Sequence, residues 1–424
     1  MKLTEFAQQF SQQAGINTLM DDLGKALSGD QPMIMMGGGN PGHLGPVQER
    51  LRAELKAVAD DPLRFQRLIG VYDTPQGNQP FIRALVDLLN RTYGWDLTEK
   101  NVALTNGSQA AFFMLFNLFA GVSEQGEKRQ ILLPMAPEYL GYADAGLAAE
   151  TFRSQRPEIH YTAPHRFKYR VDFDALKIDE RVGALCVSRP TNPTGNVLTD
   201  EEIQRLHALA VQWQIPLILD GAYGSPFPEL IYTDAQLIWD EQVVLCLSLS
   251  KLGLPAARTG IVIARPDIIE ALSGVNAILN LATGSFGPQL MEPLLRSGEI
   301  LSLSQQVVRP WYQQKMRHAQ AVLDEVLGTR CPWFLHEPEG AMFFWLWFPG
   351  LPISSQQLYE RLKTRGVLVV SGHYFFPGME ADQDWRHRHE CLRVTYSQDD
   401  AQVARGLAII AEEVVQAYEE KQHG

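Results

Sequence analysis

Residues 243–260 read VVLCLSLSKLGLPAARTG and carry the most informative structural signal in the chain. Its first eight residues predict a short buried strand, because a brief apolar run bounded by Gly and Pro is typical of one. Lys251 follows at the mouth of that strand, where burial can lower the pKa of an amine and make it a nucleophile. Ser248 precedes the lysine and Arg258 follows it, so a hydroxyl and a guanidinium can converge on one dianion. The alternative is that Lys251 is an ordinary solvent-facing lysine in a loop. The residues at the ends of the other predicted strands distinguish these two interpretations.

Composition limits the classes of function. The 424 residues carry a net charge of −12 with no basic block, which disfavours a nucleic-acid partner. The four cysteines are dispersed without a CxxC pair, so we expect neither disulfides nor a metal site. The first ten residues are polar and include an acid, unlike a signal peptide, and the most apolar stretch, 341–348, is too short to span a bilayer. We therefore expect a cytoplasmic protein with no membrane partner.

Strand and helix patterns alternate through the middle of the chain. Strands are predicted at 102–104, 131–135, 183–188, 216–219, 243–248 and 261–264, and helices at 108–119, 138–147 and 200–213. This alternation predicts an α/β fold with helices on both faces of a large, mostly parallel sheet.

The pattern changes near residue 297. A long helix at 301–326, strands at 342–348, 367–370 and 392–395, and a closing helix at 400–418 predict a smaller α+β domain. We expect an N-terminal arm over 1–44 that packs on the small domain, a large domain over 45–297 and a small C-terminal domain over 298–424.

Two loops after predicted strands carry polar groups, and ligands bind at the carboxyl ends of strands in open α/β sheets. Ser108 opens a helix after Gly107, where backbone N–H groups and the hydroxyl suit a phosphate; a plain helix N-cap is the alternative. Asn192 lies in the Pro- and Gly-rich turn 189–195, which either holds its side chain inward or is only a structural turn.

Two charged residues complete the set. Asp220 ends the strand at 216–219 and either caps a helix or binds a cationic ring nitrogen. Arg393 lies inside a strand, where it needs a partner; a substrate carboxylate fits its fork bidentately, and a protein acid is the alternative. Together with Lys251, these groups suit pyridoxal phosphate working on an amino acid.

The chain resembles the fold-type-I, class I aminotransferases from about residue 37 to residue 396. The most specific matches are Asn192-Pro193-Thr194-Gly195, Asp220-x-Ala222-Tyr223, and Ser248-x-Ser250-Lys251 with Pro255, Arg258 and Gly260 at family spacing. The resemblance implies a large, mostly parallel sheet domain sandwiched by helices, a smaller α+β domain and pyridoxal 5'-phosphate as cofactor.

The resemblance also implies roles for individual residues. Lys251 is the Schiff-base lysine and moves the proton between the amino acid Cα and the cofactor, and Asp220 pairs with the ring nitrogen. Cofactor contacts are implied for Gly107, Ser108, Gln109, Tyr139, Asn192, Tyr223, Ser248 and Arg258, with Tyr139 stacking on the ring. Arg393 binds the substrate α-carboxylate with help from Asn192 and the backbone at Gly39. Tyr72 resembles the tyrosine that reaches the phosphate of the neighbouring subunit, which implies a homodimer with shared sites.

Two features depart from the common family pattern: Arg189 replaces an asparagine, and a glycine triplet, 37–39, precedes Asn40. Both look like the branch of the family that exchanges an amino group between L-valine and pyruvate, giving 2-oxoisovalerate and L-alanine. Other amino-acid specificities (alanine, aromatic or broad) and carbon–sulfur lyase chemistry remain alternatives. A non-enzymatic cofactor-sensing regulator is a remote one, because few residues precede the matched region. Arg64, Arg67 and Arg189 are unplaced cations that could reach a substrate side chain.

Overall fold

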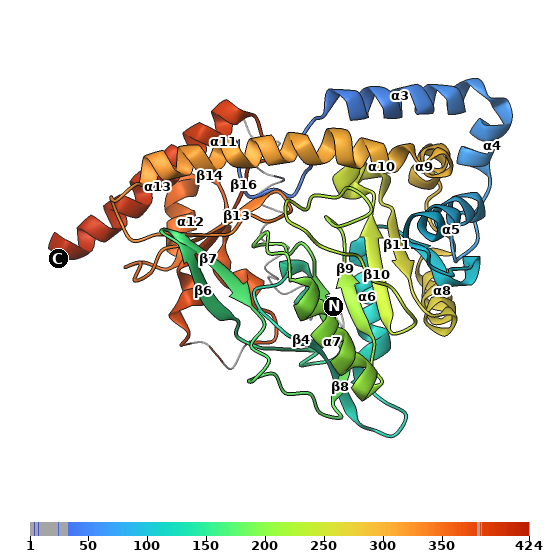
Figure 1. The fold of residues 1–424 in the computed structure, drawn as a ribbon, viewed down its shortest axis with the longest axis horizontal. Helices are drawn as coiled ribbons and strands as arrows, with labels where there is room; N and C mark the ends of the chain where they lie inside the picture. The colour runs from blue at the N-terminus through green and yellow to red at the C-terminus, as the bar shows by residue number, and fades with distance from the viewer. Residues whose placement is uncertain are drawn as a thin grey trace.

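Two main sheets organise the computed structural model, which describes residues 4, 7, 24, 33–379, 382 and 384–423 (Figure 1). The larger sheet has eight strands in the order β2-β11-β10-β9-β8-β4-β3, with β5 beside β4. Its strands are β2 (Val102–Thr105), β3 (Gly121–Val122), β4 (Lys128–Leu133), β5 (Phe152–Ser154), β8 (Val182–Ser188), β9 (Leu217–Asp220), β10 (Val243–Ser248) and β11 (Gly260–Ile263). Neighbours from β5 through β4, β8 and β9 to β10 are parallel, whereas β11 is antiparallel to β10 and β2. The predicted α/β fold is confirmed.

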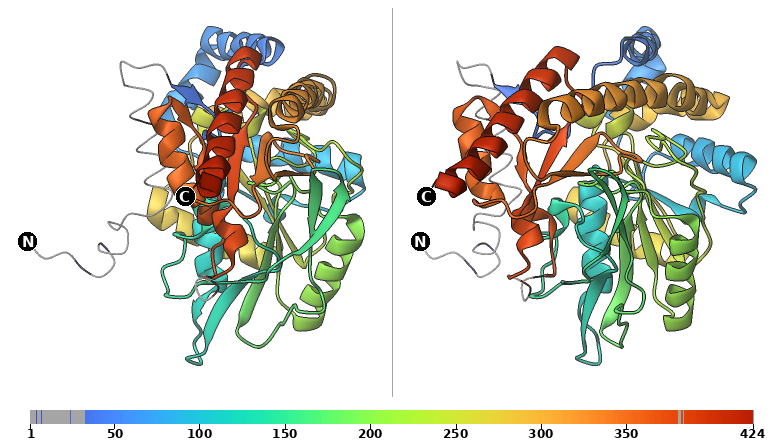
Figure 2. Two further views of the ribbon diagram at one scale, coloured as in Figure 1. Left: turned by 90° about the vertical axis from the view of Figure 1, so that its left-hand side faces the viewer. Right: turned by 60° about the vertical axis from the view of Figure 1, so that its left-hand side comes forward.

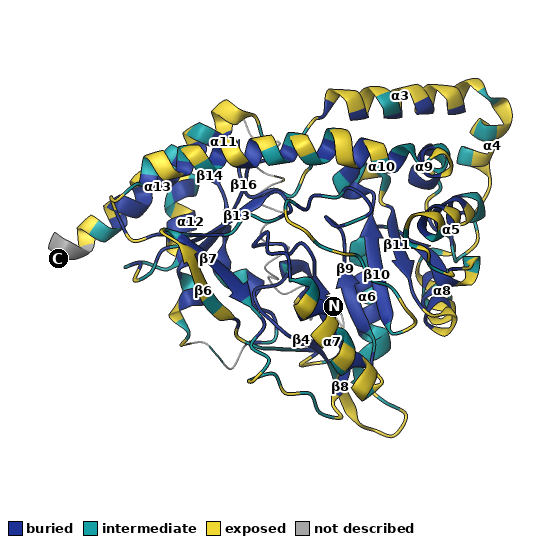
Figure 3. Ribbon diagram, in the orientation of Figure 1, coloured by how far each residue is buried: buried dark blue, intermediate teal, exposed yellow. Residues whose placement is uncertain are grey.

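Side-chain alternation along these strands explains why helices cover both faces. Successive strand residues point to opposite faces, and Ile218 and Val244 pack with Phe112 of α6 while Leu217 and Leu245 belong to the opposite core. The covering helices are α5 (Gln79–Tyr93), α6 (Ser108–Phe119), α7 (Asp200–Trp213), α8 (Pro266–Asn280) and α9 (Phe286–Ser297). The central strands are buried throughout (Figure 3).

The second sheet has six strands in the order β15-β16-β13-β12-β7-β6. They are β6 (Glu158–Ala163), β7 (Arg166–Arg170), β12 (Phe334–His336), β13 (Phe343–Trp347), β15 (Val370–Ser371) and β16 (Cys391–Thr395), and helices α12 (Ser355–Thr364) and α13 (Asp400–His423) lie beside them. The β6–β7 hairpin was not expected from the sequence. It joins this sheet because β7 pairs in parallel with β12.

A long helical stretch connects the two sheets. It begins as α10 (Glu299–Leu303), passes through a π-helical turn at Ser304–Val308 and continues as α11 (Arg309–Leu327), which reaches α13 (Figures 1 and 2). The sequence predicted one uninterrupted helix here. Pro310 at the start of α11 has no N–H to donate, which accounts for the change in hydrogen-bonding register just before it.

One predicted helix is wrong. Residues 138–147 form only a 3-10 turn at Leu140–Tyr142. The Glu138 N–H donates to the Phe375 carbonyl (2.9 Å), and Gly141 and Gly146 are poor helix formers, so tertiary contacts hold this segment in an irregular path.

The described end of the N-terminal segment runs beside the second sheet. β1 (Ile34–Met35) pairs with β14 (Val367–Leu368), and α3 (Gly45–Asp60) and α4 (Pro62–Gly70) follow. Most of the predicted arm before residue 33 lies outside the described residues. The predicted domain boundaries stay predictions.

Candidate active site

A cavity of about 870 Å³ lies where the carboxyl ends of β8, β9 and β10 meet the second sheet. The sequence-predicted residues on its wall are Gly39, Ser108, Gln109, Tyr139, Asn192, Asp220, Tyr223, Ser248, Lys251, Arg258 and Arg393. Gly107 and Tyr72 are not among its lining residues. The fold therefore brings together, at one edge of the sheet, groups that are far apart in the chain, as the position of ligand sites at strand ends predicted.

Lys251 projects into this cavity from the turn after β10. Its Nζ donates to the Gly39 carbonyl (2.6 Å). Burial lowers the pKa of the ammonium to about 8, and the positive charges of Arg393 and Arg258 add to that shift, whereas Asp220 opposes it. With this pKa about a tenth of the amine is neutral at pH 7, far more than for an ordinary lysine, and the neutral amine is the form that a nucleophile or base requires.

Asp220 is the last residue of β9 and is buried at the cavity. Its Oδ2 accepts from the Tyr142 hydroxyl (2.7 Å) and its Oδ1 from the Ala222 N–H (2.9 Å). Burial raises the carboxyl pKa, and both hydrogen bonds oppose that rise. No helix begins after Asp220, so the helix-cap alternative is wrong. Instead, Asp220 Oδ1 closes a local turn by accepting from the Ala222 N–H.

The start of α6 forms a corner suited to a phosphate. Gly107 has φ +89°, and a Cβ there would lie 2.0 Å from Arg258 Nη2, so only glycine lets the guanidinium approach. Gly107 is the N-cap of α6, not Ser108, and within the described chain the Ser108 hydroxyl has no hydrogen-bond partner. The register that pairs Ser248 with Gly260 and Gly260 with Thr105 brings the Ser248 side of the sheet to this helix start. Free N–H groups, a hydroxyl and a guanidinium thus converge where an anion is favoured.

Arg393 enters the cavity from β16 and is only 2% exposed. Its Nη1 donates to Asn192 Oδ1 (2.8 Å) and its Nη2 to the Gly37 carbonyl (2.6 Å). Nε has no partner, and no acidic side chain among the described residues is paired with this guanidinium. Burial lowers its pKa to about 10. The protein-acid alternative is therefore wrong, and the inward orientation of Asn192 is explained by this contact.

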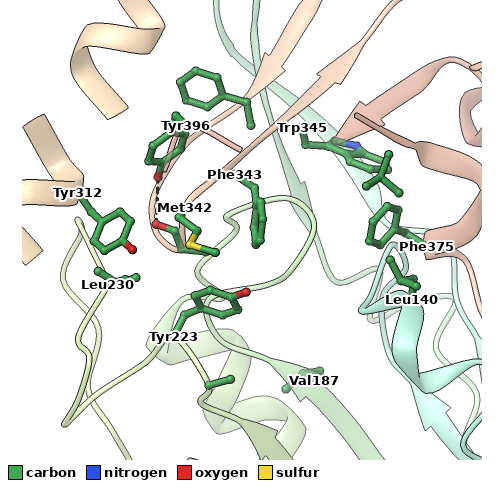
Figure 4. Close-up of a cluster of buried hydrophobic side chains, with 14 of the residues drawn as sticks. Leu140, Val187, Tyr223, Leu230, Tyr312, Met342, Phe343, Trp345, Phe375 and Tyr396 are labelled. Atoms are coloured by element: carbon green, nitrogen blue, oxygen red, sulfur yellow. Dashed lines mark hydrogen bonds between the residues drawn. The ribbon is translucent and has the colours of Figure 1, made fainter. Parts of the chain in front are cut away.

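Aromatic rings surround the same space. Tyr223 meets Phe343 edge-on at 5.8 Å between ring centroids (Figure 4), and Phe343 lies 4.3 Å from the Arg393 guanidinium. Tyr139 meets Tyr142 edge-on at 5.4 Å. Gln109 donates to the Gly141 carbonyl (2.8 Å) and so ties the start of α6 to the Tyr139 segment.

The unplaced cations lie elsewhere. Arg189 donates to the Leu198 and Gln236 carbonyls and pairs with Asp200 (2.6 Å). Arg64 pairs with Glu54 (2.7 Å). Neither they nor Arg67 line the cavity. Arg189 thus braces the turn that carries Asn192.

Two residues behind the cavity wall were not predicted from the sequence: Tyr142, which bonds Asp220, and Glu138, which bonds Ser188. Both lie in the segment that was wrongly predicted as a helix. One feature of the sequence could have pointed to them: two tyrosines three residues apart, with a carboxylate beside the first, follow a predicted strand.

The fold and the site define an enzyme class, and the comparisons with known proteins agree. The chain belongs to the aminotransferase class I and II family, whose model matches residues 33–410. It is 46% identical to valine–pyruvate aminotransferase of Escherichia coli (strain K12), covering 99% of this chain and 100% of that protein. The crystal structure of a putative amino-acid aminotransferase from Psychrobacter arcticum superposes with a TM-score of 0.95 at 46% identity, covering 99% of each chain. That of valine–pyruvate aminotransferase from Salmonella typhimurium LT2 gives 0.87 at 44% identity, covering 96% of this chain and all of that one.

Two absences concern only the described part of the chain. None of its helices has the length and apolar character that crossing a membrane requires. No group of three or more His, Cys, Asp or Glu side chains there is arranged to hold a metal ion.

Proposed function

We propose that this enzyme transfers an amino group between L-valine and pyruvate, giving 2-oxoisovalerate and L-alanine, with pyridoxal phosphate as its cofactor. The buried Arg393 carries the proposal. It has no acidic partner among the described residues and lines the same cavity as the low-pKa Lys251. A buried guanidinium in this state favours a bound carboxylate, and every 2-amino acid and 2-oxo acid has one.

The residues of the cavity fit pyridoxal phosphate. Ser108, Ser248 and Arg258 form the anion corner, and Asp220 offers a carboxylate to a protonated ring nitrogen. Tyr139 offers an aromatic face to the ring. When bound, pyridoxal phosphate supplies an electron sink for the substrate Cα.

Lys251 is the proton carrier in this proposal. Its Nζ would take the proton from the substrate Cα and hold it for return, and its lowered pKa makes the neutral amine available for that step. Arg393 and Asn192 hold the substrate carboxylate, which orients Cα toward Lys251.

The charges of the wall support small apolar substrates. Besides Lys251, Arg258 and Arg393, Lys315 is the only lysine or arginine on the cavity wall within the described residues, and Asp400 holds it at 2.5 Å. Within one subunit, a dicarboxylic amino acid therefore meets no free second cation on the described wall. L-valine and L-alanine need only an apolar wall, although discrimination between them at the level of a methylene is worth just about 1–3 kcal/mol.

A donor–acceptor panel scored by product amino acid tests the substrate. L-valine and L-alanine should lead as donors, and pyruvate and 2-oxoisovalerate as acceptors. The substrate assignment would be wrong, with the enzyme class unaffected, if L-aspartate or an aromatic amino acid exceeded both donors tenfold in kcat/KM. That factor corresponds to about 1.4 kcal/mol.

We also propose a homodimer with shared sites. Tyr72 is 82% exposed and lies between α4 and α5, and Leu63, Ile69 and Val71 in the same part of the chain are exposed apolar residues. The end of α8 adds an exposed Ile278, and α8 reaches the Tyr72 segment because Asn276 donates to the Pro75 carbonyl (2.6 Å). Exposed apolar side chains gathered in this way are typical of an interface. The cytoplasmic location stays a prediction.

A further inference from the structure

Glu138 is a fully buried carboxyl that the reaction proposed above does not use. It is 0% exposed and precedes Tyr139. Its Oε1 accepts from the Ser188 N–H (2.9 Å), and its Oε2 is hydrogen-bonded to the Ser188 hydroxyl. No cation pairs with it among the described residues. A carboxylate buried without a cation is unfavourable, whereas the neutral acid can make the same two hydrogen bonds.

A second carboxyl lies beside it. Ser188 and Asp220 are register partners at the ends of the parallel strands β8 and β9, so their backbones are about 4.8 Å apart. Glu138 is hydrogen-bonded to that register partner, and the charge of Asp220 raises the pKa of the Glu138 carboxyl. Two buried carboxyls that interact in this way do not both ionise readily.

The two environments determine which carboxyl keeps the proton. Asp220 receives the Tyr142 hydroxyl and the Ala222 N–H, faces the cavity and feels the positive charge of Lys251. Glu138 receives donors from Ser188, and from the adjacent Tyr139 N–H, but no cation stabilises it. Its pKa is raised to about 8, by burial above all and further by the charge of Asp220.

We infer that Glu138 and Asp220 form a pair that carries one negative charge, with the proton on Glu138. Glu138 is then a positioning residue. As a neutral acid it fastens the Tyr139 segment to the end of β8, and it leaves Asp220 as the anion beside the cofactor. Its own N–H bonds the Phe375 carbonyl, and the Phe375 ring lies 5.2 Å from the Arg393 guanidinium. The segment therefore joins both halves of the site. This role rests on the proposed function.

The groups that face Glu138 come from three elements. They are Asp220 on β9, Tyr142 in the 3-10 turn and Cys186 on β8. On the side of the second sheet, Glu138 contacts the Phe375 backbone carbonyl, which does not titrate. Burial raises the pKa of both Tyr142 and Cys186, so neither changes charge between pH 5 and pH 8.

The first test is the pH dependence of unfolding of the full-length protein, comparing Glu138→Gln with the wild type. A raised folded-state pKa means that the stability from the neutral acid is present below the ordinary pKa of 4.5 and is lost as pH rises through about 8. The amide copies the neutral acid and does not ionise. The Tm advantage of Glu138→Gln over the wild type should therefore grow steadily from pH 5 to pH 8. A constant difference, or a variant that is least stable relative to wild type at pH 8, would overturn the inference.

Glu202→Gln is the matched control. Glu202 is equally a buried glutamate, but hydrogen bonds from the Thr199 and Val171 N–H groups outweigh burial and lower its pKa. Glu202→Gln should therefore lose stability near pH 7, the opposite sign. This readout does not depend on catalysis, so it judges Glu138 even if the substrate proposal fails.

The second test is the pH–rate profile of the cofactor-loaded enzyme. Ionisation of Glu138 places two charges on the pair, so wild-type kcat/KM should decline above pH 8, and that decline should be smaller in Glu138→Gln. Glu138→Ala should lose about 10- to 100-fold in kcat/KM, because Ser188 loses a buried hydrogen-bond partner. Superimposable wild-type and Glu138→Gln profiles, or Gln as impaired as Ala, would contradict the positioning role.

Discussion

Replacing Tyr142 by Phe tests whether Asp220 is tuned for the cofactor. Asp220 has two protein donors, the Tyr142 hydroxyl at 2.7 Å and the Ala222 N–H at 2.9 Å, and the substitution removes the shorter contact. A hydrogen bond to a charged group contributes about 1.5–3 kcal/mol. The pKa of Asp220, already raised by burial, should rise further, and its anion should bind the ring nitrogen less well. We expect kcat/KM for L-valine with pyruvate to fall about 10- to 150-fold, which is that energy converted at 1.4 kcal/mol per tenfold.

The assay pairs steady-state kinetics with the cofactor dissociation constant. The Phe ring keeps the contacts of Tyr142 with Phe112 (5.0 Å) and Phe116 (5.1 Å), so the fold should survive. Tyr232→Phe is the matched control. It removes a hydroxyl that donates to the Ala341 carbonyl (2.7 Å) away from the cavity wall, so it should alter Tm but not kcat/KM. A Tyr142→Phe enzyme with kcat/KM within twofold of wild type, or no lower than that of Tyr232→Phe, would show that the Tyr142 hydroxyl does not tune Asp220.

Three further predictions use other parts of the molecule. Arg393→Lys should raise KM for amino acids and 2-oxo acids alike by about 10- to 100-fold, since one ammonium cannot replace a bidentate fork; unchanged KM values would remove Arg393 from the carboxylate site. Burial lowers the pKa of His336 and His387 to about 3 from 6.5, so their contribution to stability is present above pH 6.5 and is lost as pH falls. Urea unfolding between pH 7 and pH 4.5 should show up to about 2.7 kcal/mol lost per pH unit from the two groups. His336→Gln should remove about half of that contribution, while His373, whose pKa burial lowers to about 4, adds a loss of its own. Mixing Tyr72→Phe chains with Lys251→Ala chains should restore activity through one complete site per mixed dimer, whereas activity indifferent to mixing would place each site within one subunit.

The sequence predicted the groups that stand at strand ends, and it did so for a physical reason. Lys251, Asp220 and Asn192 each follow a short apolar run, and parallel strands place their carboxyl ends at one edge whatever the loops do. Arg393 was predictable because an arginine inside a strand needs an anion. The Ser108 corner lies at the same edge because β2 and β10 are both antiparallel to β11, whereas Gly39 was implied only by the family resemblance.

Other features depend on contacts between distant residues. The segment around Glu138 has helix-like spacing, but its bonds to Ser188 and Phe375, 50 and 237 residues away, determine its path. Tyr142 was missed for that reason. The β6–β7 hairpin likewise joins a sheet whose next strand, β12, begins at Phe334. Such pairings cannot be deduced from local periodicity.

The proposed chemistry requires Lys251, and covalent trapping of the cofactor tests its role. Purified protein should be yellow, and borohydride should bleach the colour and fix the cofactor to one peptide, with the added mass on Lys251. Lys251→Ala should fold, remain unlabelled and lose transamination by several orders of magnitude, because no other base is placed at the substrate Cα. A label on a different lysine, or near-normal turnover by Lys251→Ala, would contradict the account.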